Sequence, residues 1–150
     1  MNTVPDKIKT VLSVEDDEFM IFFLKDIFWV HGGGNYDFKN VNTFKKAREI
    51  LAKEDFKPDL LLVDLMFPAD DNGKPELKNG LDLIKEIKEN PKTKNAVLVV
   101  FSGYSDAEIR EKVLELGADR FMLKGEYLPK EFIEVIKQII SRRKEKKVYN

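Results

Sequence analysis

The chain has 150 residues, a length typical of one domain, and 43% of its residues are hydrophobic while 35% are charged. Its 26 basic and 27 acidic residues nearly cancel, which argues against a uniformly basic nucleic-acid-binding protein. The chain has no cysteine, which excludes a disulfide framework, a thiolate metal site and a thiol nucleophile. No apolar run approaches the roughly 20 residues that cross a bilayer, and the polar start is unlike a signal peptide. We therefore expect a cytoplasmic protein.

Short apolar runs alternate with segments of helical periodicity along the chain. The first half predicts a strand at 11–14, a helix at 17–30 that ends at the glycines 32–34, a strand at 36–41, a helix at 43–54 and a buried strand at 60–63. The second half predicts a polar loop at 68–80, a helix at 81–89, a strand at 96–101, a helix at 106–116 with Asp106 as its N-cap, a strand at 120–123 and a last helix from Pro129.

Strands that alternate with helices predict an α/β fold with a parallel sheet covered on both faces. The repeating units are too few for an eight-stranded barrel, so we expect a doubly wound five-stranded sheet of strand order 2-1-3-4-5, the flavodoxin-like arrangement. We expect one stand-alone domain over 1–150, with its core at about 8–140. The tail 141–150 holds five basic residues and one acid, which suits a solvated helix end, a contact for an acidic partner or a linker.

Polar residues follow the predicted strands at the points where the strands end. The carboxyl ends of parallel strands meet at one edge of the sheet, where ligands bind in such folds. The residues at this edge are Glu15, Asp16 and Asp17 after the first strand, Asp64 after the third, Ser102 after the fourth and Lys124 after the fifth.

Carboxylates gathered at such an edge repel one another, by on the order of 4 kcal/mol per close pair at an effective dielectric constant near 20. Lys124 supplies one compensating charge, and Mg²⁺, which prefers carboxylate oxygens, supplies two. Together they balance the three charges of Glu15, Asp16 and Asp64. A carboxylate held in such a site can attack phosphorus and form an acyl phosphate, and the Ser102 hydroxyl can hydrogen-bond a phosphoryl oxygen.

Four segments carry a family resemblance: VEDDE at 14–18, LLVDLMFP at 61–68, VVFSGY at 99–104 and GADRFMLK at 117–124. With these motifs, residues 8–140 resemble the receiver domain of two-component response regulators, the CheY-like fold. The resemblance implies that Asp64 accepts a phosphoryl group from a histidine kinase or phosphotransfer protein. It also implies a downstream protein target, no direct nucleic acid or membrane contact, and no enzyme activity beyond self-phosphorylation and self-dephosphorylation.

The resemblance further assigns roles to residues around Asp64. Asp16 would bind Mg²⁺ directly, Glu15 through water, and the Met66 carbonyl as a further ligand. Ser102 and Lys124 would contact the phosphoryl group, and Phe121 would be the aromatic residue whose rotation reports the switch. The surface formed by the fourth helix, fifth strand and fifth helix would pass the signal on. Asp17 is ambiguous: it can replace Glu15 in the acidic pair, but the register favours it as the start of the helix.

Three features depart from the family pattern. Gly125 follows Lys124 where the family has a proline, often with a cis bond. The loop 68–80 is longer than usual, so it can cap the pocket, contact a partner or be a tolerated surface insertion. Met66 and Tyr104 are bulky at positions that control access of hydrolytic water, which predicts slow self-dephosphorylation.

Other functions are also compatible with this sequence. A receiver-like interaction module that works without phosphorylation is one, although the complete residue set argues against it. A Mg²⁺-dependent phosphohydrolase of the haloacid-dehalogenase type is another, but Glu15-Asp16-Asp17 lacks the D-x-D motif. A nucleotide or flavin site would need glycines where these acids lie. Finally, the phenylalanine-rich helix near 19–28 carries a surplus apolar face that suits core packing or a protein contact.

Overall fold

A computed structural model describes residues 7–104 and 106–149, with side chains up to residue 145. Its elements are β1 (Lys9–Val14), α1 (Glu18–Asp26), the π-helical turn η1 (Ile27–His31), β2 (Tyr36–Val41), α2 (Phe44–Leu51), β3 (Leu60–Val63), α3 (Leu77–Glu89), β4 (Val97–Ser102), α4 (Ala107–Glu115), β5 (Arg120–Leu123) and α5 (Pro129–Tyr149). The end of the predicted basic tail, Asn150 and the side chains of 146–149, lies outside the described part.

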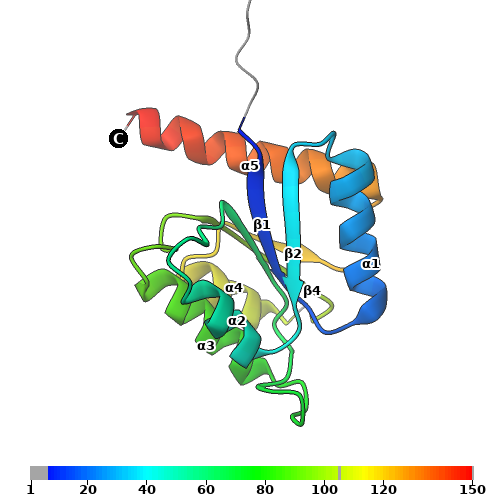
Figure 1. Cartoon of the computed structure of the whole chain (residues 1–150), viewed down its shortest axis with the longest axis vertical. Helices are drawn as coiled ribbons and strands as arrows, with labels where there is room; N and C mark the ends of the chain where they lie inside the picture. Colours follow the sequence, from blue (N-terminus) through cyan, green and yellow to red (C-terminus); the bar gives the residue numbers. More distant parts are fainter. Residues whose placement is uncertain (1–6, 105, 150) are drawn as a thin grey trace, which may run out of the picture.

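The sheet has the predicted order β2-β1-β3-β4-β5, and all four pairings are parallel. Helices α1 and α5 cover one face, while α2, α3 and α4 cover the other (Figure 1). This arrangement confirms the expected doubly wound fold. Among the described residues, no helix is both long and apolar enough to cross a membrane.

The apolar side chains form one core layer on each face of the sheet. Leu61 and Val63 of β3 point into the layer under α2, α3 and α4, whereas Leu60 and Leu62 point into the layer under α1 and α5. Every residue of β3 is buried because both faces are covered. This double burial explains why the strand reads as an unbroken apolar run rather than an alternating one.

Side-chain caps start three of the helices. The Asp17 carboxylate accepts from the Met20 amide at 3.1 Å, so Asp17 caps α1. Thr43 caps α2 in the same way, and Asp106 caps α4 as predicted. Each cap satisfies an amide of the first turn that has no partner within its own helix.

Two predicted helix ends differ from the structure. The helix predicted to reach residue 54 ends at Leu51. Beyond this end, the Lys53 amide donates to the Ile50 carbonyl at 3.3 Å. The Lys92 ammonium donates to the carbonyls of Leu51 and Lys53. The predicted helix 17–30 widens into the π-helical turn over its last residues. This turn buries Ile27 and Phe28 and leaves the residues that follow exposed.

The prediction that 68–80 is a loop was wrong at its C-terminal end, because α3 already begins at Leu77. The Glu76 amide donates to the Phe67 carbonyl at 3.2 Å, and the Asn79 side chain donates to the same carbonyl at 2.8 Å. These two bonds close the loop at its base and direct residues 77–80 into a helical turn. They are contacts between segments, so local composition, which favours a loop at Asn79-Gly80, does not reveal them.

Gly80 sits where α3 passes close to the segment after β3. A Cβ built at this position would lie 2.2 Å from the Leu65 carbonyl oxygen. Replacing a helical glycine with alanine normally stabilises a helix by up to about 1 kcal/mol. Gly80→Ala should instead destabilise the fold by about 2 kcal/mol or more, because the backbone must move to admit the methyl group.

Urea unfolding at equilibrium measures this effect. Gly73→Ala is the matched control, since Gly73 lies in the exposed part of the same loop and its added Cβ would meet nothing closer than 3.4 Å. Equal midpoints for Gly80→Ala and the unchanged chain would show that the close approach to Leu65 imposes no constraint.

Candidate functional site

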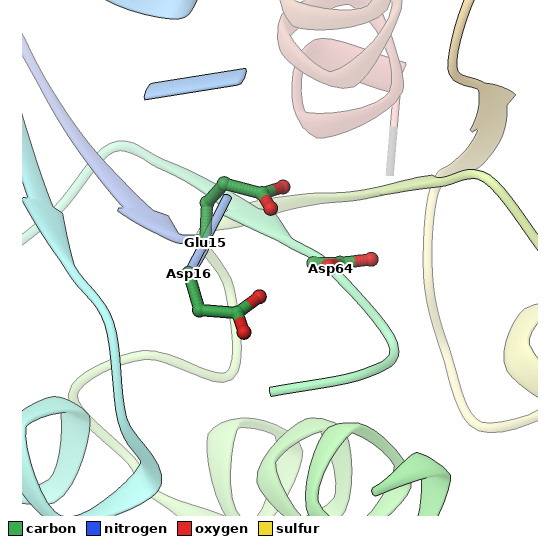
Figure 2. A group of neighbouring side chains, drawn as sticks. All are labelled: Glu15, Asp16 and Asp64. Carbon is green, nitrogen blue, oxygen red and sulfur yellow. The ribbon is translucent and has the colours of Figure 1, made fainter. Parts of the chain in front are cut away.

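Three carboxylates meet at the carboxyl ends of β1 and β3. Glu15 and Asp16 follow β1 directly, Asp64 follows β3, and one oxygen from each lies within 4.8 Å of the others. The three side chains point the same way at this edge of the sheet (Figure 2). Glu15 and Asp64 are buried while Asp16 is partly exposed, so the cluster opens to solvent on one side. The predicted convergence of these acids is therefore present in the fold.

Lys124 reaches this cluster from the end of β5. Its ammonium nitrogen lies 2.7 Å from Glu15 Oε2 and 3.2 Å from Asp64 Oδ2. The side chain is largely buried, so these ion pairs lie in a medium that screens charge less than water does. Parallel pairing of β5 with β4, and of β4 with β3, carries Lys124 to acids that lie far from it in the sequence.

The donor set fits a divalent cation such as Mg²⁺. Three carboxylates and one ammonium leave a net charge of −2 if all are ionised, and oxygen is the ligand atom that Mg²⁺ prefers. Both oxygens of Glu15 are engaged, one by Lys124 and the other by the Asp17 amide at 3.1 Å. Asp16 accepts no hydrogen bond from another residue within the described part, so its oxygens face the opening. This arrangement favours direct coordination by Asp16 and coordination through water by Glu15.

Backbone contacts hold Glu15 in place, and one of the residues that make them, Asn40, is not among the predicted site residues. The Asn40 side chain donates to the Glu15 carbonyl at 3.1 Å, and the Glu15 amide donates to the Val41 carbonyl at 3.0 Å. Asn40 lies near the end of β2, at the same edge as the acids. Its place near the end of a predicted strand could have marked it as a residue of this site.

The Asp64 carboxylate is positioned by the chain that follows it. The Leu65 amide donates to Asp64 Oδ1 at 2.8 Å, and the backbone amides of Leu65 and Met66 lower the pKa of this carboxylate against the larger effect of burial. Met66 itself is 38% exposed, so its side chain lies at the rim rather than in the core. Since Asn79 holds the Phe67 carbonyl, the segment from Asp64 to Phe67 is fixed at both ends.

Ser102 ends β4, the strand between those of Asp64 and Lys124. Its hydroxyl is buried and accepts from the Tyr104 amide at 3.1 Å, while its carbonyl accepts from the Lys124 amide at 2.8 Å. Phe121 of β5 is 5% exposed and packs in the core layer under α4, with the Arg110 guanidinium 5.5 Å from its ring centre. Ser102 and Phe121 are thus both turned inward.

The loop that follows β3 lies against the start of α2. The carbonyls of Pro68 and Ala69 accept from the amides of Phe44 and Lys45 at 3.0 and 2.9 Å, and Asp71 pairs with Lys46 at 3.3 Å. These bonds satisfy first-turn amides of α2 that its own helix cannot. The loop after β3 is therefore held against the start of α2 by hydrogen bonds and an ion pair.

Gly125, which stands where the family resemblance expects proline, adopts φ +87°. This left-handed conformation is open to glycine at little cost, and side chains with a Cβ rarely adopt it. The chain after Lys124 therefore turns with a geometry that a proline at this position does not allow, since proline fixes φ near about −65°.

Burial and mutual repulsion shift the pKa values of the clustered acids. Burial, and then the neighbouring Asp64 charge, raise the pKa of Glu15 from 4.5 to about 7 against the opposing effect of Lys124. The pKa values of Asp16 and Asp64 are also raised, in both cases mainly by burial. Burial lowers the pKa of Lys124, but Asp64 and Glu15 outweigh it and leave that pKa above its usual value.

The raised pKa of Glu15 predicts that metal-free protein loses stability as the pH rises. Between pH 4.5 and about 7 the folded state binds more protons at Glu15 than the unfolded state does, so the free energy of unfolding should fall by on the order of 3 kcal/mol. Urea unfolding across this range with a chelator present measures the slope. Glu15→Gln should remove most of it, and a Glu15→Gln protein with the full slope would assign the titration to another group.

Comparison with known proteins adds an independent line of evidence. The family model of the response regulator receiver domain matches residues 11–137. Over 120 residues, 80% of this chain and 24% of the relative, the chain is 29% identical to a probable cyclic di-GMP phosphodiesterase of Vibrio cholerae. Over 85 residues, 57% of this chain and 33% of the relative, it is 32% identical to the phosphate regulon transcriptional regulatory protein PhoB of Escherichia coli K12. The matched regions thus span a third or less of these curated relatives.

Solved structures share the fold. A CheY-like response regulator receiver domain protein from Methanospirillum hungatei superposes with a TM-score of 0.74 at 21% sequence identity, covering 93% of this chain and 99% of that one. At this identity the likeness concerns the fold alone. It agrees with the strand order found here.

Proposed function

The chain belongs to the response regulator receiver domain family, and on this premise we propose that it accepts a phosphoryl group on Asp64 from a histidine kinase or phosphotransfer protein. The observation that carries the proposal is the cluster of Glu15, Asp16 and Asp64 beside the Lys124 ammonium. It combines a carboxylate nucleophile, a site for a divalent cation and a fixed positive charge within one edge of the sheet. Each of these three parts favours phosphoryl transfer to a carboxylate.

In the proposed step an oxygen of Asp64 attacks the phosphorus of a phosphohistidine, the phosphorus–nitrogen bond breaks, and the nitrogen keeps the electron pair. The Leu65 amide orients the attacking carboxylate. Lys124 and the Ser102 hydroxyl then hold oxygens of the transferred group. When bound by Asp16, Asp64 and the Met66 carbonyl, with Glu15 acting through water, Mg²⁺ supplies positive charge that offsets the charge of this group.

Phosphorylation then shifts an existing equilibrium between two conformations of the domain. Ser102 would move toward the new group and Phe121 would follow, which links the pocket to the surface of α4, β5 and α5. A downstream protein reads that surface. We take this receiver domain to be cytoplasmic, with its core at about 8–140 and with no chemistry beyond gain and loss of its own phosphoryl group.

Intact-protein mass spectrometry after mixing with acetyl phosphate tests the proposal. We expect a gain of one phosphoryl group that requires Mg²⁺ and disappears with a chelator. Unchanged mass together with unconsumed donor would favour a module that acts without phosphorylation. Donor consumption with no stable adduct would favour the phosphohydrolase alternative.

A further inference from the structure

A hollow of about 230 Å³ lies at the amino ends of β1 and β2, beside the second half of α5. Figure 1 shows α5 running across these strand ends, at the edge of the sheet opposite to the one where Glu15 follows β1. We call it the amino-edge hollow, and its polar lining consists of Lys9, Asn35, Tyr36, Lys137, Ser141 and Lys144. No carboxylate of a described residue lines it.

Backbone hydrogen bonds fix the strand side of the amino-edge hollow. The Lys9 amide donates to the Asn35 carbonyl at 2.9 Å. The amide and the side chain of Asn35 both donate to the Gly32 carbonyl, at 3.3 and 3.2 Å. Tyr36 begins β2, and its ring packs edge-on against Phe28 at a ring-centre distance of 5.1 Å. These contacts hold the starts of β1 and β2 together, so this side of the hollow is in place without a ligand.

The helix side of the hollow is one face of α5. Lys137, Ser141 and Lys144 recur at spacings of four and three residues, which bring side chains together on a helix surface. Ile136 and Ile139 are buried in the core layer under α1 and α5, and they fix the rotation of the helix about its axis. The face that carries the two lysines is thereby turned toward the strand ends.

Three ammonium groups share the amino-edge hollow, and their charges are poorly compensated by the described residues. Lys9 and Lys144 form no ion pair within the described part of the chain. Lys137 lies 3.6 Å from Glu134, but both side chains are about half exposed, and such surface pairs contribute little to stability. Because like charges repel, an anion with several charges would stabilise this arrangement when it binds.

Charged groups next to the hollow have partners of their own. The Arg143 guanidinium donates to both oxygens of Asp119, at 2.8 and 2.7 Å. Asp59 lines an adjoining hollow, and its carboxylate accepts from the Thr10 amide at 2.8 Å. The three lysines of the amino-edge hollow differ from these neighbours in keeping their charges for a ligand.

Two hydroxyl groups add neutral hydrogen-bonding capacity to the lining. Burial, and then the Glu134 charge, raise the pKa of Tyr36, so its phenol stays protonated at neutral pH and can donate. The Ser141 hydroxyl can donate as well. Ammonium and hydroxyl groups are both donors, and phosphate oxygens are strong acceptors. The lining therefore matches a ligand with many acceptor oxygens and several negative charges close together.

We propose that the amino-edge hollow binds a di- or triphosphate group. A group of this kind places several charges within reach of the ammonium groups of Lys9, Lys137 and Lys144, whereas a single carboxylate would compensate only one of them. The hollow is smaller than the pockets of about 300–1,000 Å³ that enclose drug-sized ligands, so it would hold the phosphates and not the whole of a nucleotide. The inference is independent of the proposed function, because it concerns the opposite edge of the sheet.

Isothermal titration calorimetry of the full chain with pyrophosphate and tripolyphosphate tests the proposal, with a chelator present so that no metal ion draws these anions to the acidic cluster. We expect saturable binding at one site, at least about tenfold tighter than that of sulfate at equal ionic strength. Lys9→Gln and Lys144→Gln should each weaken it by about fivefold, the effect of losing one partly exposed charge contact. Lys112→Gln is the matched control, because Lys112 is exposed on α4, on the other face of the sheet.

Amide chemical shifts locate the bound anion. The amides of Asn35 and Ser141 should shift on titration with pyrophosphate, while that of Leu65 at the acidic edge should not. Tighter binding of ADP than of pyrophosphate would support the proposal with a nucleotide as the source of the phosphates, and any other order would support it with a free inorganic anion. Absence of saturable binding, equal affinity for sulfate and pyrophosphate, or unchanged affinity in the double variant Lys9→Gln, Lys144→Gln would overturn it.

Discussion

Asp64→Asn should gain no phosphoryl group under conditions in which the unchanged chain gains one. An amide oxygen is a far weaker nucleophile than a carboxylate, so the attack on phosphorus fails although the side chain keeps nearly the same shape. The variant should also be more stable than the parent at neutral pH, because the pKa of Asp64 is raised by burial and its charge therefore opposes folding. Failure of the reaction thus cannot be ascribed to unfolding.

Intact mass after incubation with acetyl phosphate and Mg²⁺ measures the first effect, and urea unfolding measures the second. Asp70→Asn is the matched control, since Asp70 is an exposed acid in the loop that follows Asp64. It should gain the phosphoryl group as the parent does. An adduct of full yield on the Asp64→Asn protein would assign the acceptor to another residue and end the proposed role of Asp64.

Lys124→Met should make the metal-free protein markedly less stable at neutral pH. The Lys124 ammonium is the one group in the described part that pairs with both Glu15 and Asp64. Removing one partner of a buried ion pair typically costs about 3 kcal/mol or more, because the other charge is left without compensation. Mg²⁺ should still bind to the three carboxylates, and it should stabilise the variant more than it stabilises the parent.

Urea unfolding with and without Mg²⁺ at pH 7 measures both effects. Lys130→Met is the control, because Lys130 is exposed and forms no ion pair with a described residue. If Lys124→Met lost Mg²⁺ binding as well, the lysine would be needed to arrange the carboxylates and not merely to balance their charge. If Lys124→Met still gains a phosphoryl group, the lysine is not needed for acceptance of that group, and its role lies in the conformational switch that follows.

Local sequence predicted much of the site because polar groups at strand ends are constrained by topology. Once alternating strands and helices are recognised, Asp64 and Lys124 must share an edge with Glu15, and the ion pairs of Lys124 with both acids agree with this. Asp17 was correctly favoured as a helix start, since the cap to Met20 follows from local spacing. To predict that Lys124 pairs with Glu15, only the strand order is needed in addition to the positions of the strands.

Contacts between distant segments were not predictable in this way. The helical turn at residues 77–80 depends on the Phe67 carbonyl, which the Asn79 side chain reaches across the loop. The Asn40 side chain donates to the backbone carbonyl of Glu15, and the residue type at position 40 does not by itself predict this hydrogen bond. The close approach of Gly80 to Leu65 likewise exists only once α3 has packed.

The sequence by itself determined the fold class and the identity of the acids at the strand ends, because hydrophobic periodicity and the alternation of strands with helices follow from local residue pattern. Only the tertiary structure decided which apolar residues of α1 face the core. Phe22 and Phe23 are adjacent and chemically identical, yet Phe23 packs against Phe132 while Phe22 is exposed. The docking of α1 onto the sheet and α5 selects one side of the helix, and an apolar composition on both sides leaves that choice to packing.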